Sequence, residues 1–262
     1  MSSEVETSLE ISDSRRIQRF LDSARNVKTH DAERALFADL TVCHDENPRS
    51  AATNMAIDEA LLESATIPLI RFYRWRSPAL SFGYFGRFSD VAIYAAERDL
   101  VRRWTGGGIV LHGDDLTYSV MIPASDPAFK ESPIWIYEKI HRALADALNG
   151  VGERAVLAGS ARCADRPSRR GVDTSDCFTN PVRSDVMMDG RKIAGAAQRR
   201  TGRGLLQQGS IQGFLMKTDL AQKFSQALSA NCREFEINEE IFQRAREFAH
   251  QKYRTESWLK KR

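Results

Sequence analysis

The stretch RRWTGGGIVLHGDDLTYSV at residues 102–120 places three consecutive glycines between runs of apolar and β-branched residues. The runs at 109–112 and 116–122 have the composition of strands, and a third strand is expected at 100–104. Glycines let the backbone of the intervening turn approach a ligand closely and aim amide N–H groups at it. This segment therefore predicts strands joined by a candidate ligand-binding loop.

Side chains beside the glycines indicate which ligand such a loop would bind. Arg102, Arg103 and Thr105 supply hydrogen-bond donors for a carboxylate, a phosphate or a thioester oxygen. Glycine runs also occur in plain hairpin turns, and a single histidine such as His112 is more often structural than catalytic. A binding loop and an ordinary turn both remain open on these residues alone.

Patterns in the rest of the chain favour an α+β fold over a doubly wound sheet, because strands cluster in hairpins and helices stand apart from them. Helical spacing is found at 53–65, 91–100, 133–148, 219–228 and 238–251. Strands are expected at 67–75, 79–83, 184–188, 192–199 and 204–211. Asp189 and Gly190 predict a type I′ hairpin turn between two of these strands.

Composition sets bounds on the organisation of the 262 residues. Residues 1–35 are polar and charged and predict a flexible arm, whereas residues 36–262 predict a single catalytic domain. The net charge of +3, from 38 Lys and Arg against 35 Asp and Glu, is too balanced to indicate nucleic-acid binding. No apolar run is long enough to span a membrane and no secretory signal is evident, so we expect a cytoplasmic protein with free thiols.

The four cysteines include one candidate nucleophile and form no metal-binding pattern. Cys177 directly follows a long polar loop at residues 159–176, so it is a better nucleophile candidate than Cys43 or Cys232. Nearby cations would lower the pKa of its thiol and raise the thiolate fraction. Cys163 lies within the loop itself, and its role stays open.

Lys192 lies fifteen residues after Cys177, in a predicted strand with small neighbours that include Gly195 and Ala196. Small side chains leave a groove, and a lysine directed into it would bind an anionic or carbonyl oxygen. A solvated strand lysine is the commoner alternative.

Several segments together resemble the lipoate and biotin protein ligase superfamily, and the match is close to its cysteine-dependent octanoyltransferases. The similar segments are NMAIDEALL (54–62), IRFYRW (70–75), LSFGYF (80–85), residues 102–120, CFTNPVRSDVMMDGRKIAGAAQRR (177–200), LLQQGSI (205–211) and KYRTESWLKKR (252–262). The resemblance implies a ligase-like catalytic domain with a central mixed β-sheet and packed helices. It covers residues 36–262.

The resemblance also implies functional residues. Cys177 would carry the acyl group as a thioester, and Lys192 would be the lysine shared across the superfamily. The substrate-binding residues would be Arg102, Arg103, Thr105, Gly106, Gly107, Gly108, His112, Asp185, Gly195 and Ala196. No metal or cofactor is expected for a transferase.

Three functions remain open on the sequence. The first is transfer of an octanoyl or lipoyl group from acyl carrier protein to a lysine of lipoyl domains, such as those of glycine cleavage H protein or dehydrogenase E2 subunits. The second is an ATP-dependent and Mg-dependent lipoate–protein ligase or a lipoyl amidotransferase, for which Asp185 would be the acidic residue. The third is a non-catalytic paralogue that binds lipoyl domains.

Partners of the expected kind are acidic proteins, so basic side chains are docking candidates. Arg199, Arg200 and Arg203 follow the Lys192 segment, and Arg166, Arg169 and Arg170 lie in the long loop. Ordinary solvated charge is the alternative for both sets.

Overall fold

The computed structural model describes residues 35–159, 181–213 and 219–261, and its main feature is a mixed eight-stranded sheet. Its strands in spatial order are β11 (Cys232–Glu234), β1 (Leu40–Arg49), β2 (Leu69–Trp75), β6 (Leu116–Pro123), β10 (Gly204–Ile211), β9 (Arg191–Arg200), β8 (Val186–Met188) and β7 (Ala155–Leu157). The β11–β1 and β1–β2 pairs are parallel, and the other neighbours are antiparallel. This mixed sheet confirms the α+β prediction.

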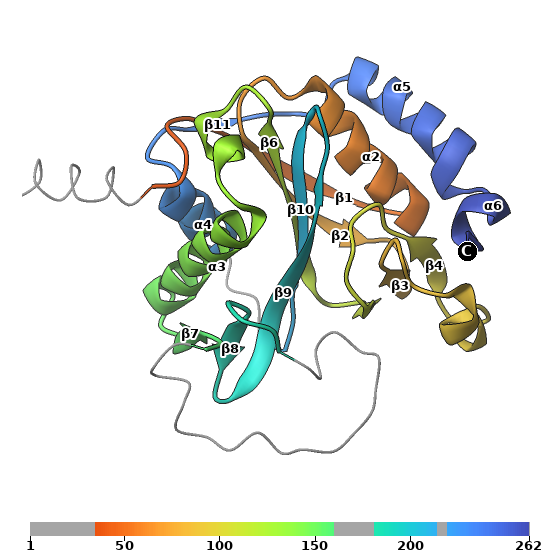
Figure 1. Ribbon diagram of the computed structural model, residues 1–262, viewed down its shortest axis with the longest axis horizontal. Helices are drawn as coiled ribbons and strands as arrows, with labels where there is room; N and C mark the ends of the chain where they lie inside the picture. The colour runs from red at the N-terminus through yellow and green to blue at the C-terminus, as the bar shows by residue number, and fades with distance from the viewer. Residues whose placement is uncertain (1–34, 160–180, 214–218, 262) are drawn as a thin grey trace, which may run out of the picture.

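Helices cover both faces of the sheet, as Figure 1 shows. Helices α3 (Pro133–Gly150) and α4 (Leu220–Leu228) lie on one face, and α2 (Ala51–Ser64) and α5 (Glu239–Phe248) lie on the other. Successive strand residues point to opposite faces, so Leu205 of β10 joins the core under α3 while Leu206 joins the core under α2. The sheet thus separates two apolar cores.

A second, three-stranded sheet places the glycine turn beside the large sheet. Its order is β4 (Asp99–Arg102), β3 (Ala79–Phe82) and β5 (Ile109–His112), and residues 103–108 join β4 to β5. A Cβ atom on Gly83 would lie 2.0 Å from the carbonyl oxygen of Gly107, so only a glycine at position 83 permits this approach. The turn is therefore packed against the end of β3.

Local sequence signals account for the ends of two long helices. Ser50 accepts a hydrogen bond from the Thr53 N–H at the start of α2, and Ser132 accepts one from the Trp135 N–H at the start of α3. Pro133 occupies the first position of α3, where its missing N–H costs no hydrogen bond. The predicted start of α3 is confirmed.

The hairpin between β8 and β9 also agrees with the sequence. Asp189 and Gly190 both have positive φ, at 49° and 76°, as a type I′ turn requires. The turn directs β9 back along β8 and fixes where Lys192 emerges from the strand.

The predicted helix over residues 91–100 is wrong. The structure has two short 3₁₀ turns, η1 (Phe88–Asp90) and η2 (Ala92–Tyr94), followed by β4. Ile93 is 78% exposed, so the segment has no continuous apolar stripe that a helix could bury. Asp99 and Leu100, the last two residues of the predicted helix, belong instead to β4 and pair with β3.

Two predictions concern residues outside the described part of the chain: the N-terminal arm, apart from residue 35, and the loop that carries Cys163 and Cys177. None of the described helices is long and apolar enough to cross a membrane.

Candidate active site

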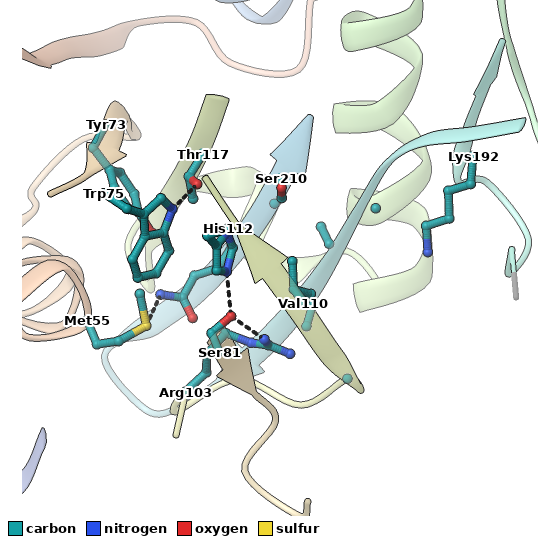
Figure 2. Close-up of a pocket in the computed structure, with 16 residues that line it drawn as sticks. Met55, Tyr73, Trp75, Ser81, Arg103, Val110, His112, Thr117, Lys192 and Ser210 are labelled. Carbon is teal, nitrogen blue, oxygen red and sulfur yellow. Dashed lines mark hydrogen bonds between the residues drawn. The ribbon is translucent and has the colours of Figure 1, made fainter. Parts of the chain in front are cut away.

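A pocket lies between the α2-covered face of the large sheet and the three-stranded sheet (Figure 2). Lys192 of β9 reaches in from one side, and Met55, Tyr73 and Trp75 lie on the opposite side. Ser210 of β10 lies between these two ends. The pocket therefore has a cationic end and an aromatic, largely apolar end.

Lys192 is held by a carboxylate that has no exposed surface. Its Nζ lies 2.8 Å from Asp185 Oδ2, and only 6% of the lysine side chain is exposed. The Val182 N–H donates to the same carboxylate oxygen at 2.7 Å, and the Tyr137 hydroxyl donates to Asp185 Oδ1 at 2.5 Å. These contacts fix the ammonium group at the pocket wall.

Tyr137 links this ion pair to the backbone of β9. Burial raises the pKa of Tyr137, and the negative charge of Asp185 raises it further, so the phenol stays protonated at neutral pH. Its oxygen accepts a hydrogen bond from the Ala196 N–H at 3.2 Å. Ala196 is thereby positioned through the same set of contacts as Lys192.

Gly195 leaves the space through which the Lys192 side chain passes. A Cβ atom at position 195 would lie 2.5 Å from Lys192 Cε and 2.6 Å from Lys192 Nζ. The absence of a side chain is therefore a steric requirement of the lysine's placement. The predicted grouping of Lys192, Gly195 and Ala196 at one pocket is what the structure shows.

Next to the aromatic end lies a buried row of hydrogen-bonded groups from Asp115 to Arg103. His112 Nδ1 is 2.8 Å from Asp115 Oδ2, and His112 Nε2 is 2.7 Å from Ser81 Oγ. Arg103 Nη1 donates to Ser81 Oγ at 2.7 Å. Trp75 stacks on the imidazole with ring centroids 4.0 Å apart.

The contacts of His112 define its tautomer. Burial lowers the pKa of His112 despite the adjacent Asp115, so the ring is neutral at pH 7. Nδ1 donates to the carboxylate, and Nε2 accepts from the Ser81 hydroxyl. Ser81, His112 and Asp115 thus have the distances of a nucleophile, a base and an orienting acid.

The Arg103 guanidinium extends this row into the glycine turn. Its Nη2 donates to the carbonyl oxygens of Gly106 at 3.0 Å and Gly108 at 2.8 Å. Gly107 has φ of +85°, a conformation that favours glycine. Arg103 therefore sets the shape of the turn, and Gly107 lines the pocket.

A second buried network anchors Thr105 beneath the turn. Thr105 donates to Gln208 Oε1 at 2.8 Å, and Gln208 Nε2 donates to Asp58 Oδ2 at 2.7 Å. Asp58 also pairs with Arg71 at 2.8 Å, and both side chains are fully buried. Thr105 thus acts as a structural support of the turn rather than as part of the pocket lining.

Arg102 lies elsewhere, although it was predicted beside Arg103 in the pocket. Neighbouring residues at the end of a strand point in opposite directions, and the Arg102 guanidinium donates to the carbonyl oxygens of Trp258, Leu259 and Lys261. It also donates to the carbonyl oxygen of Tyr84 at 2.8 Å. Arg102 therefore binds the C-terminal segment to the small sheet.

Asp185 also differs from the prediction. It does not line the pocket, and its two oxygens already accept from Tyr137, Lys192 and Val182. A buried carboxylate that accepts from three protein donors, one of them an ammonium group, fits a positioning role. No group of three potential metal-binding side chains occurs within residues 35–159, 181–213 and 219–261.

The two described cysteines are poor nucleophiles. Cys43 is buried, and desolvation raises the pKa of its thiol to about 11. Burial, with a contribution from Glu234, raises the pKa of Cys232. Both thiols are protonated at neutral pH, which agrees with the preference for Cys177 as the nucleophile candidate.

The sequence profile of the lipoyl protein ligase A/B catalytic domain matches residues 50–244. The chain belongs to this family. The lipoyl protein ligase A/B match spans both the glycine turn and Lys192, and so confirms the resemblance stated from the motifs.

Curated relatives narrow the comparison within the lipoyl protein ligase A/B family. Octanoyltransferase LipM of Bacillus cereus is 36% identical over 201 residues, which cover 74% of this chain and 71% of that protein. Octanoyltransferase LipM of Macrococcus caseolyticus is 32% identical over 270 residues, which cover 84% of this chain and 96% of that protein.

Solved structures confirm the ligase-like fold. A bipartite lipoate protein ligase from Thermoplasma acidophilum has a TM-score of 0.64 and 21% identity, over 85% of this chain and 96% of that chain. Lipoate-protein ligase A bound with ATP has a TM-score of 0.64 and 22% identity, over 85% and 98% of the two chains. At these identities the likeness concerns the fold alone.

Several residues of the site were not predicted from the sequence. They are Met55, Tyr73, Trp75, Ser81, Asp115, Thr117, Tyr137, Gln208 and Ser210. Alternate polar positions in TYS and QQGS, within otherwise apolar strands, were a usable signal for residues 117, 208 and 210.

Proposed function

We propose that this chain transfers an octanoyl group from the thioester of an acyl carrier protein to a lysine of a lipoyl domain. Relatives named octanoyltransferase, at 32–39% identity, support octanoyl transfer. The carrier-protein donor, the lipoyl-domain acceptor and the cysteine route are our inference from the family and the site chemistry.

One structural observation carries the chemical part of the proposal. A nearly buried ammonium group, Lys192, stands at the end of a pocket whose other end is apolar and aromatic. The apolar end is chemically suited to an acyl chain, whose carbonyl oxygen would then lie near a positive charge. Such a charge stabilises the oxyanion that forms when a nucleophile attacks the carbonyl carbon.

The proposed reaction has two steps. The Cys177 thiolate attacks the donor thioester, the carrier thiol leaves with a proton, and an octanoyl-cysteine thioester forms. The amine of the acceptor lysine then attacks this thioester, an amide forms, and the Cys177 thiol is regenerated. A thioester is already activated, so neither step consumes ATP. Cys177 lies outside the described residues, so its part rests on the sequence.

ATP-dependent ligation is the second candidate. It would need a carboxylate to bind a metal ion with ATP, and both oxygens of Asp185 already accept from protein donors. This occupancy favours the transferase.

The two candidates are separated by one reconstituted assay. Purified protein is incubated with octanoyl carrier protein and a lipoyl domain without ATP, and amide formation is followed by mass spectrometry. Transfer that disappears in Cys177→Ala supports the proposal. Modification that needs free acid and ATP, and that survives Cys177→Ala, overturns it in favour of a ligase.

A further inference from the structure

Three cations gather beside the glycine turn, outside the pocket described above. They are Arg199 at the end of β9 and, from the C-terminal segment, Lys252 and Lys261, and we call them the cation cluster. Lys252 Nζ lies 4.5 Å from the ring centroids of both Trp104 and Trp258. The cations thus share one set of aromatic rings.

Arg199 and Lys261 meet over a single tyrosine. Arg199 Cζ lies 5.1 Å from the Tyr84 ring centroid, and Lys261 Nζ lies 4.4 Å from it and donates to the Tyr84 hydroxyl. The hydrogen bond from Lys261 lowers the pKa of Tyr84, and the positive charge of Arg199 lowers it further. Both cations therefore act on the same half-buried phenol.

The charge of the cluster is not balanced by the described residues. Glu59 pairs with Lys252 at 2.7 Å, and it is the only carboxylate found within ion-pair distance of the three cations in the described part of the chain. Arg199 Nε is buried and has no hydrogen-bond partner among those residues. An unpaired buried donor in a group of like charges is unfavourable, and a bound anion would satisfy it.

Arg200 and Arg203 lie close to Arg199 in the sequence but do not belong to the cation cluster. Arg200 donates to the carbonyl oxygens of Glu131 and Phe129, and Arg203 pairs with Glu63. These two arginines thus have protein partners. Of the three arginines expected to form a docking surface, Arg199 is the one that belongs to the cation cluster.

The cluster lies along the path from the pocket. Trp104 lies two residues before Gly106, the first glycine of the turn, and the Tyr84 N–H donates to the Thr105 carbonyl oxygen at 2.8 Å. Ala197, two residues before Arg199 on β9, lines the pocket. From Gly195 to Arg199 a strand advances about 13 Å, and a pantetheine arm, with a backbone equal to four or five extended residues, spans roughly 15 Å.

We propose that Arg199, Lys252 and Lys261 form a subsite for the phosphodiester of a pantetheine-linked acyl donor. This inference rests on the proposed function, because it takes the donor to be a carrier-protein thioester. The acyl chain would occupy the pocket, and the pantetheine arm would cross the glycine turn. No atom lies within 4 Å of the place that a Cβ atom on Gly106 would take, so the pantetheine arm would meet no side chain there. The cations would then neutralise the phosphate at the far end.

The test compares octanoyl-4′-phosphopantetheine with octanoyl-pantetheine as donors to a lipoyl domain. The KM of the phosphorylated donor should be lower by about tenfold or more, since a charge-assisted contact to phosphate has that effect. This advantage should disappear in Arg199→Gln and in Lys261→Gln. It should persist in the matched controls Arg200→Gln and Lys260→Gln, whose side chains are bound to other groups. Equal KM values in the wild-type protein overturn the subsite and leave octanoyl transfer intact.

A binding measurement separates failure of the subsite from failure of the proposed function. Titration calorimetry with unacylated 4′-phosphopantetheine should show binding that Arg199→Gln weakens about tenfold. Binding without any octanoyl transfer would retain the subsite and refute the proposed function. AMP bound more tightly than phosphopantetheine, with the same dependence on Arg199, would assign the cluster to a nucleotide and overturn the donor subsite.

Discussion

Lys192 Nζ and Asp185 Oδ2 are 2.8 Å apart, and the aspartate has no exposed surface. A buried ion pair with further hydrogen bonds fixes the direction of an ammonium group far better than a surface pair does. The direction matters because β9 holds Lys192 at the wall of the pocket in which we propose that the acyl chain binds.

The variant Asp185→Asn should lower kcat for octanoyl transfer by about 10²-fold, the range seen when an oxyanion-stabilising group is lost. It should also lower the free energy of unfolding by about 3 kcal/mol, because it leaves Lys192 buried without its charge partner. Rates with saturating donor and urea unfolding give the two quantities. Asp219→Asn, which removes an exposed pair with Lys223, is the control and should change stability by less than about 1 kcal/mol. An unchanged kcat in Asp185→Asn would show that Asp185 does not position Lys192 for the reaction.

Gly195→Ala should displace the Lys192 side chain from its place at the pocket wall. The added Cβ atom would lie 2.5 Å from Lys192 Cε, so the side chain must adopt another rotamer. We expect kcat to fall at least about tenfold and the melting temperature to fall as well, because the displaced lysine loses its buried ion pair with Asp185. Gly202→Ala, at a position with open space, is the matched control. Full activity in Gly195→Ala would show that Lys192 does not need the space that Gly195 leaves.

Arg102→Lys should destabilise the protein, although Arg102 belongs to the glycine-turn motif. The guanidinium donates to backbone carbonyls of the C-terminal segment and of residues 84 and 86, and an ammonium group cannot reach them all. We expect a loss of about 3 kcal/mol from several charge-assisted hydrogen bonds. Denaturant unfolding measures the loss, and Arg76→Lys, at an exposed position, serves as control. A stability equal to that of the control would contradict the structural role.

Stability should fall as the pH is lowered from 7 to 5. His141 is buried between Ser184 and Tyr118, and burial lowers its pKa to about 4. Between pH 6.5 and pH 4 the unfolded chain binds a proton that the folded chain does not, so unfolding is favoured as the pH falls. Between pH 7 and pH 5, His141 should account for a loss of about 2 kcal/mol in the free energy of unfolding.

Urea unfolding of the wild-type protein and of His141→Gln at both pH values measures this loss. The glutamine keeps one donor and one acceptor but does not titrate, so it should flatten the pH dependence. Equal slopes for the two proteins would assign the acid sensitivity to other groups.

Features set by short-range sequence were predictable, and those set by long-range contact were not. The helix start at Ser132 and the hairpin turn at Asp189 depend on neighbouring residues, and both were predicted. Arg102 and Arg103 are equivalent in composition, and only the strand geometry sends one to the C-terminus and the other to the glycine turn. No local pattern distinguishes them.

The buried polar networks illustrate the same limit. Ser81 and His112 are 31 residues apart in the chain and meet only because β3 pairs with β5. Strand β1 was not predicted, because its polar residues resemble a loop until Asp45 pairs with Arg71 of β2. The sequence therefore indicates which side chains carry chemistry more readily than it indicates which ones meet.

The central claim is that Cys177 carries the octanoyl group between donor and acceptor while Lys192 stabilises the oxyanion that forms. Intact-protein mass spectrometry after mixing with octanoyl carrier protein, without acceptor or ATP, tests it most directly. The account predicts one added octanoyl group, mapped by peptide digestion to Cys177, absent in Cys177→Ala and discharged when a lipoyl domain is added. An unmodified protein that nevertheless octanoylates the lipoyl domain, or an adduct retained in Cys177→Ala, would contradict it.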